Sequence, residues 1–363
     1  MARPATETRR ALQPLWSALD THLGPRLATG AVLCVSGGSD SRALLECAAR
    51  WPGRFGGELV VASVDHGTRL EAAGEARAVA ARAGALALPS HVVVVAPGGA
   101  SEHALREARY RALTSLAHRL GLGCLVVAHH ADDVAEGAVL SWLGAGGGPG
   151  GAAPPRVADL DGVAVVRPFL HLPRAALRAA LSAIGALDWC TDPDASSERA
   201  RVRALLAEVG RGRALGPSLA SAAQRRREDE EVLTAAAAAL IEEHSGYLEV
   251  PGRAPPALVR RALEVAVRRT GCKDPRRAGP GVAVALHLLG RGRAGRVDLV
   301  GARLEVTGEG RVLVHHDGAV AGAPVPTHAV GVSPLAVAPA MRTFVGSPRS
   351  DAPDEPRKSD EQP

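Results

Sequence analysis

The sequence Ser36-Gly37-Gly38-Ser39-Asp40-Ser41 follows the apolar run Ala31–Val35 and opens a helix-like segment, Ser41–Arg50. Its two glycines allow a tight turn, and backbone N–H groups at the start of a helix favour an anion such as phosphate or pyrophosphate. A carboxylate beside such an anion is tolerated where Mg²⁺ lies between them, so Asp40 is a candidate metal ligand. The sequence lacks the pattern GxxxxGK followed by Ser or Thr, which excludes a Walker P-loop.

Short apolar runs alternate with helix-like segments over residues 1–185. Runs that are apolar throughout suit strands buried on both faces, which predicts a doubly wound α/β domain with a parallel sheet. Such sheets bind ligands beyond the carboxyl ends of their strands, so the chemistry is expected at residues 36–41, 65–67 and 129–136. The predicted strands are Ala31–Val35, Glu58–Val64, His91–Ala96, Cys124–Ala128 and Val163–Val166, and the predicted helices are Ser41–Arg50, Glu71–Ala83, Glu102–Leu120, Asp132–Leu143 and Arg174–Ile184.

The second half of the chain is rich in arginine. Residues 199–296 contain 19 basic and 10 acidic side chains, a balance that favours a nucleic-acid partner. We predict long helices over Pro217–Glu243 and Pro256–Thr270 and a small hairpin over Val297–Val314. The resulting organisation is an N-terminal helical extension (1–25), the α/β domain (26–205), a mainly helical arginine-rich domain (206–318) and a disordered tail (319–363).

Composition narrows the class of protein. The five cysteines are scattered without a CxxC spacing, which argues against a structural zinc site and a disulfide framework. No uncharged apolar run is long enough for a membrane span, and a soluble cytoplasmic protein is expected. The chain has 4 Trp, 2 Tyr and 3 Phe, so contacts with RNA are expected to depend on arginine and hydrogen bonds more than on aromatic stacking.

The loop at residues 36–41 resembles the pyrophosphate loop of the N-type ATP pyrophosphatases (PP-loop enzymes), which adenylate a carbonyl oxygen and release pyrophosphate. Together with five further stretches it resembles the tRNA(Ile)-lysidine synthetases over residues 28–205, and weakly as far as residue 315. Those stretches are Val64-Asp65-His66-Gly67, Ala104-Leu105-Arg106-Glu107-Ala108-Arg109-Tyr110, Ala128-His129-His130-Ala131-Asp132-Asp133 with Glu136, Arg167-Pro168-Phe169-Leu170 and Trp189-Cys190-Thr191-Asp192-Pro193.

The resemblance implies an adenine nucleotide alpha-hydrolase-like fold and a ligase that converts ATP to AMP and pyrophosphate. In that family the C2 carbonyl oxygen of the wobble cytidine of a CAU-anticodon isoleucine tRNA is adenylated. The ε-amine of L-lysine then attacks C2 and expels AMP, which gives lysidine. The implied cofactors are ATP and Mg²⁺, the implied partners are that tRNA and L-lysine, and no membrane is involved.

The candidate residues suit this chemistry. Arg106 and Arg109 are three residues apart on one helix face and can clamp phosphate oxygens. Asp133 and Glu136, also three apart, are by resemblance the acids that recognise the lysine ammonium. The predicted catalytic residues are Asp40, Arg106, Arg109, Asp133 and Glu136; the predicted nucleotide-binding residues are Ser36, Gly37, Gly38, Ser39, Asp40, Ser41, Asp65, His66 and His129; and Asp40 is the candidate Mg²⁺ ligand.

Some of these residues also allow a structural interpretation. Asp132 fits a structural role or a place near the metal. His129 and His130 could be metal ligands, but no third soft ligand is near them in the sequence, which favours positioning of the nucleotide or the loop.

The sequence departs from the family pattern in three places. The paired aspartates are followed by Val134-Ala135-Glu136-Gly137 where the family has Gln-Ala-Glu-Thr. Leu143-Gly144-Ala145-Gly146 replaces Arg-Gly-Ser-Gly in a loop, 144–155, expected to cover the site as a flap. Asp194-Ala195 replaces Ser-Asn, while Arg201 and Arg203 match the basic segment that follows. These changes bear on substrate handling more than on activation by ATP.

Two alternatives stay open. A tRNA thiolation enzyme could use the same loop, but sulfur relay needs reactive cysteines, and Cys34 lies in a predicted buried strand. A homologue that binds tRNA or nucleotide without turnover is compatible with the altered flap.

Overall fold

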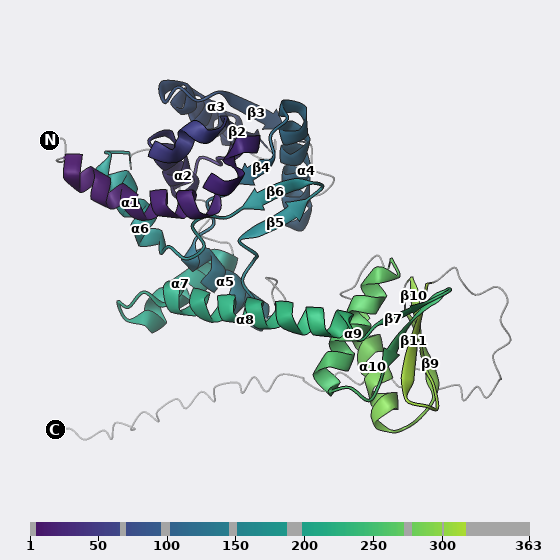
Figure 1. Ribbon diagram of the computed structural model, residues 1–363. Helices are drawn as coiled ribbons and strands as arrows, with labels where there is room; N and C mark the ends of the chain where they lie inside the picture. The colour runs from purple at the N-terminus through teal and green to yellow at the C-terminus, as the bar shows by residue number, and fades with distance from the viewer. Residues whose placement is uncertain are drawn as a thin grey trace, which may run out of the picture. The chain divides into compact units, whose positions relative to one another are not determined.

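The computed structural model describes residues 5–65, 70–95, 102–144, 151–186, 198–271, 278–299 and 301–316 (Figure 1). Contacts within the chain divide it into two compact units, Met1–Ala236 and Ala237–Pro363. The predicted tail, 319–363, lies outside the described residues.

The first unit is built on a six-stranded sheet in the order β3-β2-β1-β4-β6-β5. Strands β3, β2, β1, β4 and β6 run parallel, and β5 pairs with β6 antiparallel at the edge. The predicted doubly wound parallel sheet is therefore confirmed. The strands are β1 (Ala31–Cys34), β2 (Leu59–Asp65), β3 (Ser90–Val94), β4 (Cys124–Val126), β5 (Val157–Leu160) and β6 (Val163–Val166).

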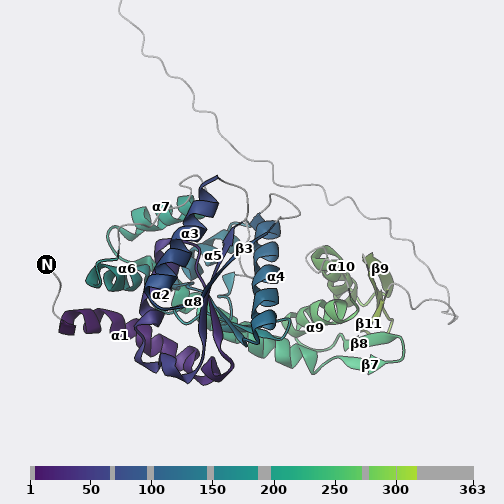
Figure 2. The same ribbon diagram turned by 90° about the horizontal axis from the view of Figure 1, so that it is seen from above.

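Helices cover both faces of this sheet, because its central strands alternate their buried side chains between two cores. Leu33 packs on one face in a core with residues of α1, α2, α3 and α6, and Val32 packs on the other with residues of α4. Figure 2 shows α2 and α3 on one side of the sheet and α4 on the other. The helices are α1 (Ala5–His22), α2 (Ser39–Ala49), α3 (Leu70–Ala85), α4 (Glu102–Leu120), α5 (Ala131–Trp142), α6 (Arg174–Ala183), α7 (Glu198–Gly210) and α8 (Leu215–Ala238).

Helices α5 and α8 form a further small core of the first unit. Val134 and Ala138 of α5 pack with Ala220 and Ala223 of α8. The helix α5 also contacts α7. These contacts hold α5, which carries the predicted acids Asp133 and Glu136, against α7 and α8.

The second unit has more strand than the sequence predicted. A five-stranded antiparallel sheet, in the order β7-β8-β11-β10-β9, packs against α9 (Pro256–Arg269) and α10 (Ala278–Gly290). The predicted helix at 256–270 is confirmed. The predicted continuation of the preceding helix to Glu243 is wrong, because α8 ends at Ala238 and Glu242 begins a strand. The strands are β7 (Glu242–His244), β8 (Tyr247–Pro251), β9 (Gly295–Leu299), β10 (Ala302–Val306) and β11 (Arg311–His316).

Candidate active site

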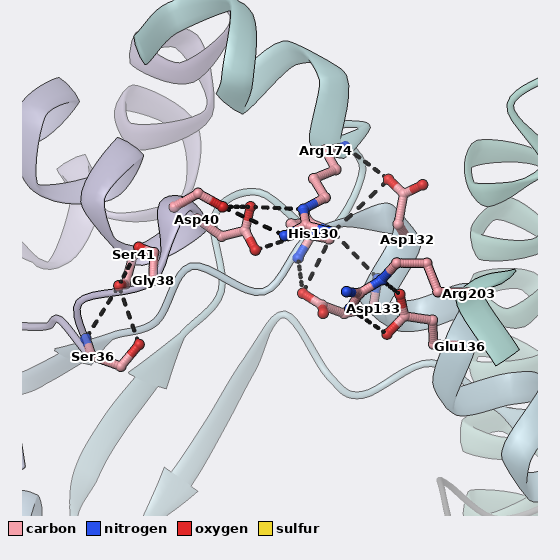
Figure 3. Close-up of polar contacts among 11 residues, drawn as sticks. Ser36, Gly38, Asp40, Ser41, His130, Asp132, Asp133, Glu136, Arg174 and Arg203 are labelled. Carbon is pink, nitrogen blue, oxygen red and sulfur yellow. Dashed lines mark hydrogen bonds and ion pairs between the residues drawn. The ribbon is translucent and has the colours of Figure 1, made fainter. Parts of the chain in front are cut away.

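The loop after β1 is closed by hydrogen bonds of its own serines (Figure 3). The Ser36 N–H donates to Ser41 Oγ over 3.1 Å, and the Ser41 hydroxyl donates to the Gly38 carbonyl over 2.9 Å. Gly37 has a φ of 90°, a backbone conformation that side chains with a Cβ rarely adopt. The helix α2 begins at Ser39, and the N–H groups in a first helical turn have no acceptor inside the helix. The loop predicted to bind an anion is thus closed by its own hydrogen bonds and leads directly into a helix start.

Asp40 lies in the first turn of α2 between two basic side chains (Figure 3). Its Oδ2 lies 3.3 Å from His130 Nε2, and its Oδ1 accepts from Arg174 Nε over 3.3 Å. Burial acts to raise the pKa of Asp40, but the hydrogen bonds and charges of His130 and Arg174 hold it below its ordinary value. Asp40 is therefore a carboxylate at neutral pH.

His130 joins Asp40 to the start of α5. The side chain is 1% exposed, and its Nδ1 accepts from the Asp133 N–H over 3.2 Å, while the Asp133 carboxylate accepts from the His130 N–H over 3.0 Å. This reciprocal cap needs an unprotonated Nδ1, so the proton of the neutral ring is on Nε2, facing Asp40. Burial acts to lower the pKa of His130, but the bond to Asp40 and the charges of Asp133, Asp40 and Asp132 raise it overall.

Asp132 has a structural role in this arrangement. Its Oδ2 accepts from the Arg174 N–H over 2.7 Å and so caps the start of α6. A Cβ at Gly216, in the first turn of α8, would collide with the Asp132 carboxylate. Glycine at this position therefore lets α8 pack closely against Asp132. The structural interpretation of Asp132 agrees with these contacts.

Glu136 is buried and paired. Its residue is 1% exposed, and its carboxylate accepts from Arg203 of α7, at 2.8 Å from Nε and 3.4 Å from Nη2. Asp133 is less enclosed, with a side chain 23% exposed. Both predicted lysine-recognising acids thus lie on α5, one engaged in a helix cap and the other in an ion pair (Figure 3).

His129 and His130 are neighbours in the chain, but different charged groups act on them. Burial first, and then the charges of Arg167, Arg106, Arg109 and Arg199, lower the pKa of His129 to about 3. The side chains of Arg106 and Arg109 lie with their guanidinium carbons 5.2 and 5.6 Å from the centre of the Tyr110 ring. The two histidines therefore face different surroundings, one acidic and one basic.

Comparison with known proteins identifies the family of the domain that carries these residues. The model of the PP-loop domain family matches residues 12–209. The chain belongs to this family.

Within this family, the chain is similar to proteins named tRNA(Ile)-lysidine synthase. A tRNA(Ile)-lysidine synthase of Methylobacterium nodulans is 47% identical over 197 residues, 52% of this chain and 56% of the relative. One from Methylobacterium sp. strain 4-46 is 43% identical over 210 residues, 54% of this chain and 59% of the relative. The chain thus matches little more than half the length of each.

A solved structure supports the PP-loop fold. The U34-tRNA thiolase NcsA from Methanococcus maripaludis superimposes with a TM-score of 0.50 over 61% of this chain and 80% of its own, at 13% identity. At that identity the likeness concerns the fold alone.

The structure describes only some of the remaining predicted residues of the PP-loop site. Asp65 is the last residue of β2 and is buried. His66, the loop 145–150 of the expected flap, and the stretch Trp189–Pro193 lie outside the described residues. Among the residues that the structure describes, no group of three or more His, Cys, Asp and Glu side chains could hold a metal ion. A site made of one carboxylate and nucleotide phosphates is still compatible with this finding, since Mg²⁺ often binds in that way.

No sequence pattern assigns a role to Arg174, and Arg167 stands out in the sequence only as part of the stretch Arg167-Pro168-Phe169-Leu170. Arg174 follows Pro173 at the start of α6, a position without a catalytic pattern. Arg203 was noted only as part of a basic segment, because its partner Glu136 is 67 residues away in the chain.

The low pKa of His129 predicts an acid-sensitive fold. A histidine that titrates near 6.5 when unfolded and near 3 when folded makes the unfolded state bind more protons between those values, so stability falls as pH falls through this range. The loss is at most about 1.4 kcal/mol per pH unit. We expect His129→Asn to flatten the change in unfolding free energy between pH 6.5 and 5.0, measured by urea unfolding.

The control variant is His91→Asn, which makes the same chemical change at an exposed position. Its pH dependence should match that of the wild type. Equal slopes for the wild type and His129→Asn would contradict the assignment of a neutral His129.

Proposed function

We propose that the chain catalyses the ATP-dependent ligation of L-lysine to C2 of the wobble cytidine of the CAU-anticodon isoleucine tRNA, through an adenylated cytidine, to give lysidine. The observation that carries this proposal is the junction of the PP-loop acid Asp40, through His130, with Asp133 on the helix that also bears Glu136. The loop acid and one candidate amine-binding acid are thereby linked through one histidine, and the other candidate acid lies one turn further along the same helix. The names of the matched relatives support the same reaction.

Activation of the cytidine needs a positioned triphosphate more than a strong acid or base. The loop 36–41 and the start of α2 would bind the pyrophosphate portion through backbone N–H groups. Arg106 and Arg109 lie on α4 without a carboxylate partner in the described part of the chain, and are available for phosphate oxygens of either ATP or the tRNA. Asp40 would hold Mg²⁺ beside those phosphates, and the ion would neutralise charge that develops on the leaving pyrophosphate.

The amine is the second substrate. A lysine ammonium would be held by Asp133 and Glu136, and one carboxylate would accept a proton before the amine attacks. Glu136 already binds Arg203, but a carboxylate has about four acceptor positions and can hold a second cation. Arg203 would then keep Glu136 ionised and oriented while the ammonium is bound.

The test is incorporation of radiolabelled L-lysine into an in-vitro transcript of the CAU-anticodon isoleucine tRNA, with ATP and Mg²⁺. Elongator methionine tRNA is the control. Incorporation into the first alone is the expected result. AMP formation without lysine transfer would keep the activation step and reject lysine as the nucleophile. Neither signal, from folded protein, would favour a homologue that binds without turnover.

The three cysteines that the structure describes do not suit the sulfur relay of a tRNA thiolation enzyme. Burial raises the pKa of Cys34 to about 12 and also raises the pKa of Cys47 and of Cys124. These three are thiols at neutral pH and poor nucleophiles. Cys190 and Cys272 lie outside the described residues. No helix among the described residues is long and apolar enough to span a membrane.

The Glu136–Arg203 pair can be tested from both sides. We expect Glu136→Gln to lower kcat/KM for lysine by about 10²-fold, chiefly through KM, because a charge-assisted bond to the ammonium is lost. Arg203→Gln breaks the same ion pair but leaves the carboxylate, and its effect on KM for lysine should be smaller. Equal losses in the two variants, with KM unchanged, would make the pair purely structural.

A further inference from the structure

A second group of basic side chains lies around Arg167 and His129, apart from Asp40. Its arginines come from four parts of the first unit, and their charges act on one or both of these two residues. They are Arg106 and Arg109 of α4, Arg167 directly after β6, Arg199 of α7 and Arg227 of α8. Arg227 pairs with Glu231 of its own helix, but positive charges gathered around the buried Arg167 still favour a bound anion.

Arg167 is the most enclosed member of this arginine cluster. The residue is 6% exposed, and its Nη1 donates to the Pro155 carbonyl over 2.9 Å. Its Nε is buried and finds no hydrogen-bond partner among the residues that the structure describes. Burial chiefly lowers the pKa of Arg167, and Arg106 and Arg227 lower it further, while Tyr110 acts in the opposite direction. A buried donor left unpaired is costly, so its position indicates a missing acceptor.

The cluster differs in place from the PP-loop. Strand β4 lies between β1 and β6, and α2 and α4 cover opposite faces of the sheet. After β4 the chain directs His130 to Asp40 at the start of α2, and directs His129 to the arginines of α4 and Arg167. A ligand in the arginine cluster would therefore contact the carboxyl ends of β4 and β6 from the α4 side.

We propose that this cluster is a second anion site, in which Arg167 with Arg106 and Arg109 binds a phosphate ester of a bound polynucleotide. The choice of RNA as the source rests on the proposed function. The PP-loop already supplies donors for the pyrophosphate of a nucleotide. Arginines spread over α4, α7 and α8 suit an RNA strand, which carries one negative charge per nucleotide. Neutral His129 adds a hydrogen-bond donor without adding charge.

The test measures binding by the full chain, without lysine and without turnover. The probes are ATP, and the in-vitro transcript of the CAU-anticodon isoleucine tRNA over a series of salt concentrations. Arg167→Gln is compared with Arg178→Gln, which removes an equal charge from an exposed position on α6. We expect Arg167→Gln to weaken RNA binding about tenfold and to reduce the slope of log K against log salt by about one, with ATP binding within about twofold of the wild type. Arg178→Gln should change neither by as much.

Stability separates this role from a structural one. Because Arg167→Gln removes a buried cation from among like charges, the Tm of the ligand-free protein should stay the same or rise. Weakened ATP binding with full RNA binding would overturn the choice of RNA and would assign the arginine cluster to the nucleotide. A lower Tm with both affinities unchanged would overturn the proposal, as would full RNA binding by Arg167→Gln.

These outcomes are independent of the proposed reaction. If Arg167→Gln binds RNA as tightly as a wild type that incorporates lysine, the phosphate site is wrong and the ligase is not. If the wild type binds RNA through Arg167 but never incorporates lysine, the phosphate site is supported and the proposed ligase reaction is wrong.

Discussion

Replacement of Asp40 by asparagine is expected to reduce tRNA-dependent release of pyrophosphate by at least about 10²-fold while tRNA binding is retained. The substitution keeps the shape of the side chain and removes its charge. Asp40 is ionised between His130 and Arg174 at the start of α2, where phosphates and Mg²⁺ are proposed to bind. A preorganised charge at a reacting phosphate accounts for rate losses of this size when it is removed.

The matched control is Asp159→Asn, at an exposed position on the edge strand β5. It should release pyrophosphate at the wild-type rate. An equal collapse of tRNA binding and turnover in Asp40→Asn would contradict the assignment, because it would mean that Asp40 supports RNA binding. The alanine variant should behave as the asparagine variant does, since both remove the carboxylate.

Local pattern was enough to predict most of the first unit. The helix at 102–120 and the strand at 163–166 have the predicted bounds. An uninterrupted apolar run indicates a buried strand, and a helical periodicity of apolar residues indicates a helix, without information from distant parts of the chain. The edge strand Val157–Leu160 was missed, since it contains Asp159 and is only partly buried. Likewise β7 consists of Glu242, Glu243 and His244, all exposed, and offers no apolar run that would predict a strand.

Candidate residues could be located from the sequence, but their partners could not. The motif after β4 placed Asp133 and Glu136 on one helix, as the structure has them. The sequence gives no sign that Arg203 binds Glu136, or that the adjacent His129 and His130 face opposite charges. Such contacts depend on how distant elements are brought together by the sheet.

A buried ion cluster on α2 shows the same limit and carries the largest expected effect on stability. Glu46 is completely buried, and its carboxylate accepts from Arg82 of α3 over 2.6 and 2.9 Å and from Arg50 over 2.7 Å, with Arg42 3.4 Å away. Burial acts to raise the pKa of Glu46, but Arg82 and Arg50 hold it below its ordinary value. The pairs therefore stabilise the fold at neutral pH, and this contribution is lost as pH falls through the folded pKa of Glu46.

Glu46→Gln is expected to destabilise the first unit by about 3 kcal/mol at pH 7. The buried carboxylate loses its charge-assisted bonds to Arg82 and Arg50, whose side chains are 32% and 35% exposed, and the buried Arg42 loses the carboxylate 3.4 Å away. This destabilisation corresponds to a Tm lower by about 10 °C for a unit of this size, measurable by calorimetry. Glu107→Gln breaks an ion pair of the same spacing, between Glu107 and Arg111, whose side chains are 58% and 72% exposed. Water screens that pair, so the control should cost about 0.5 kcal/mol. Similar shifts in the two variants would show that α2 is not held to α3 through Glu46. A large shift in Glu46→Gln alone would show that the PP-loop helix is anchored to its neighbour by charge as well as by apolar packing.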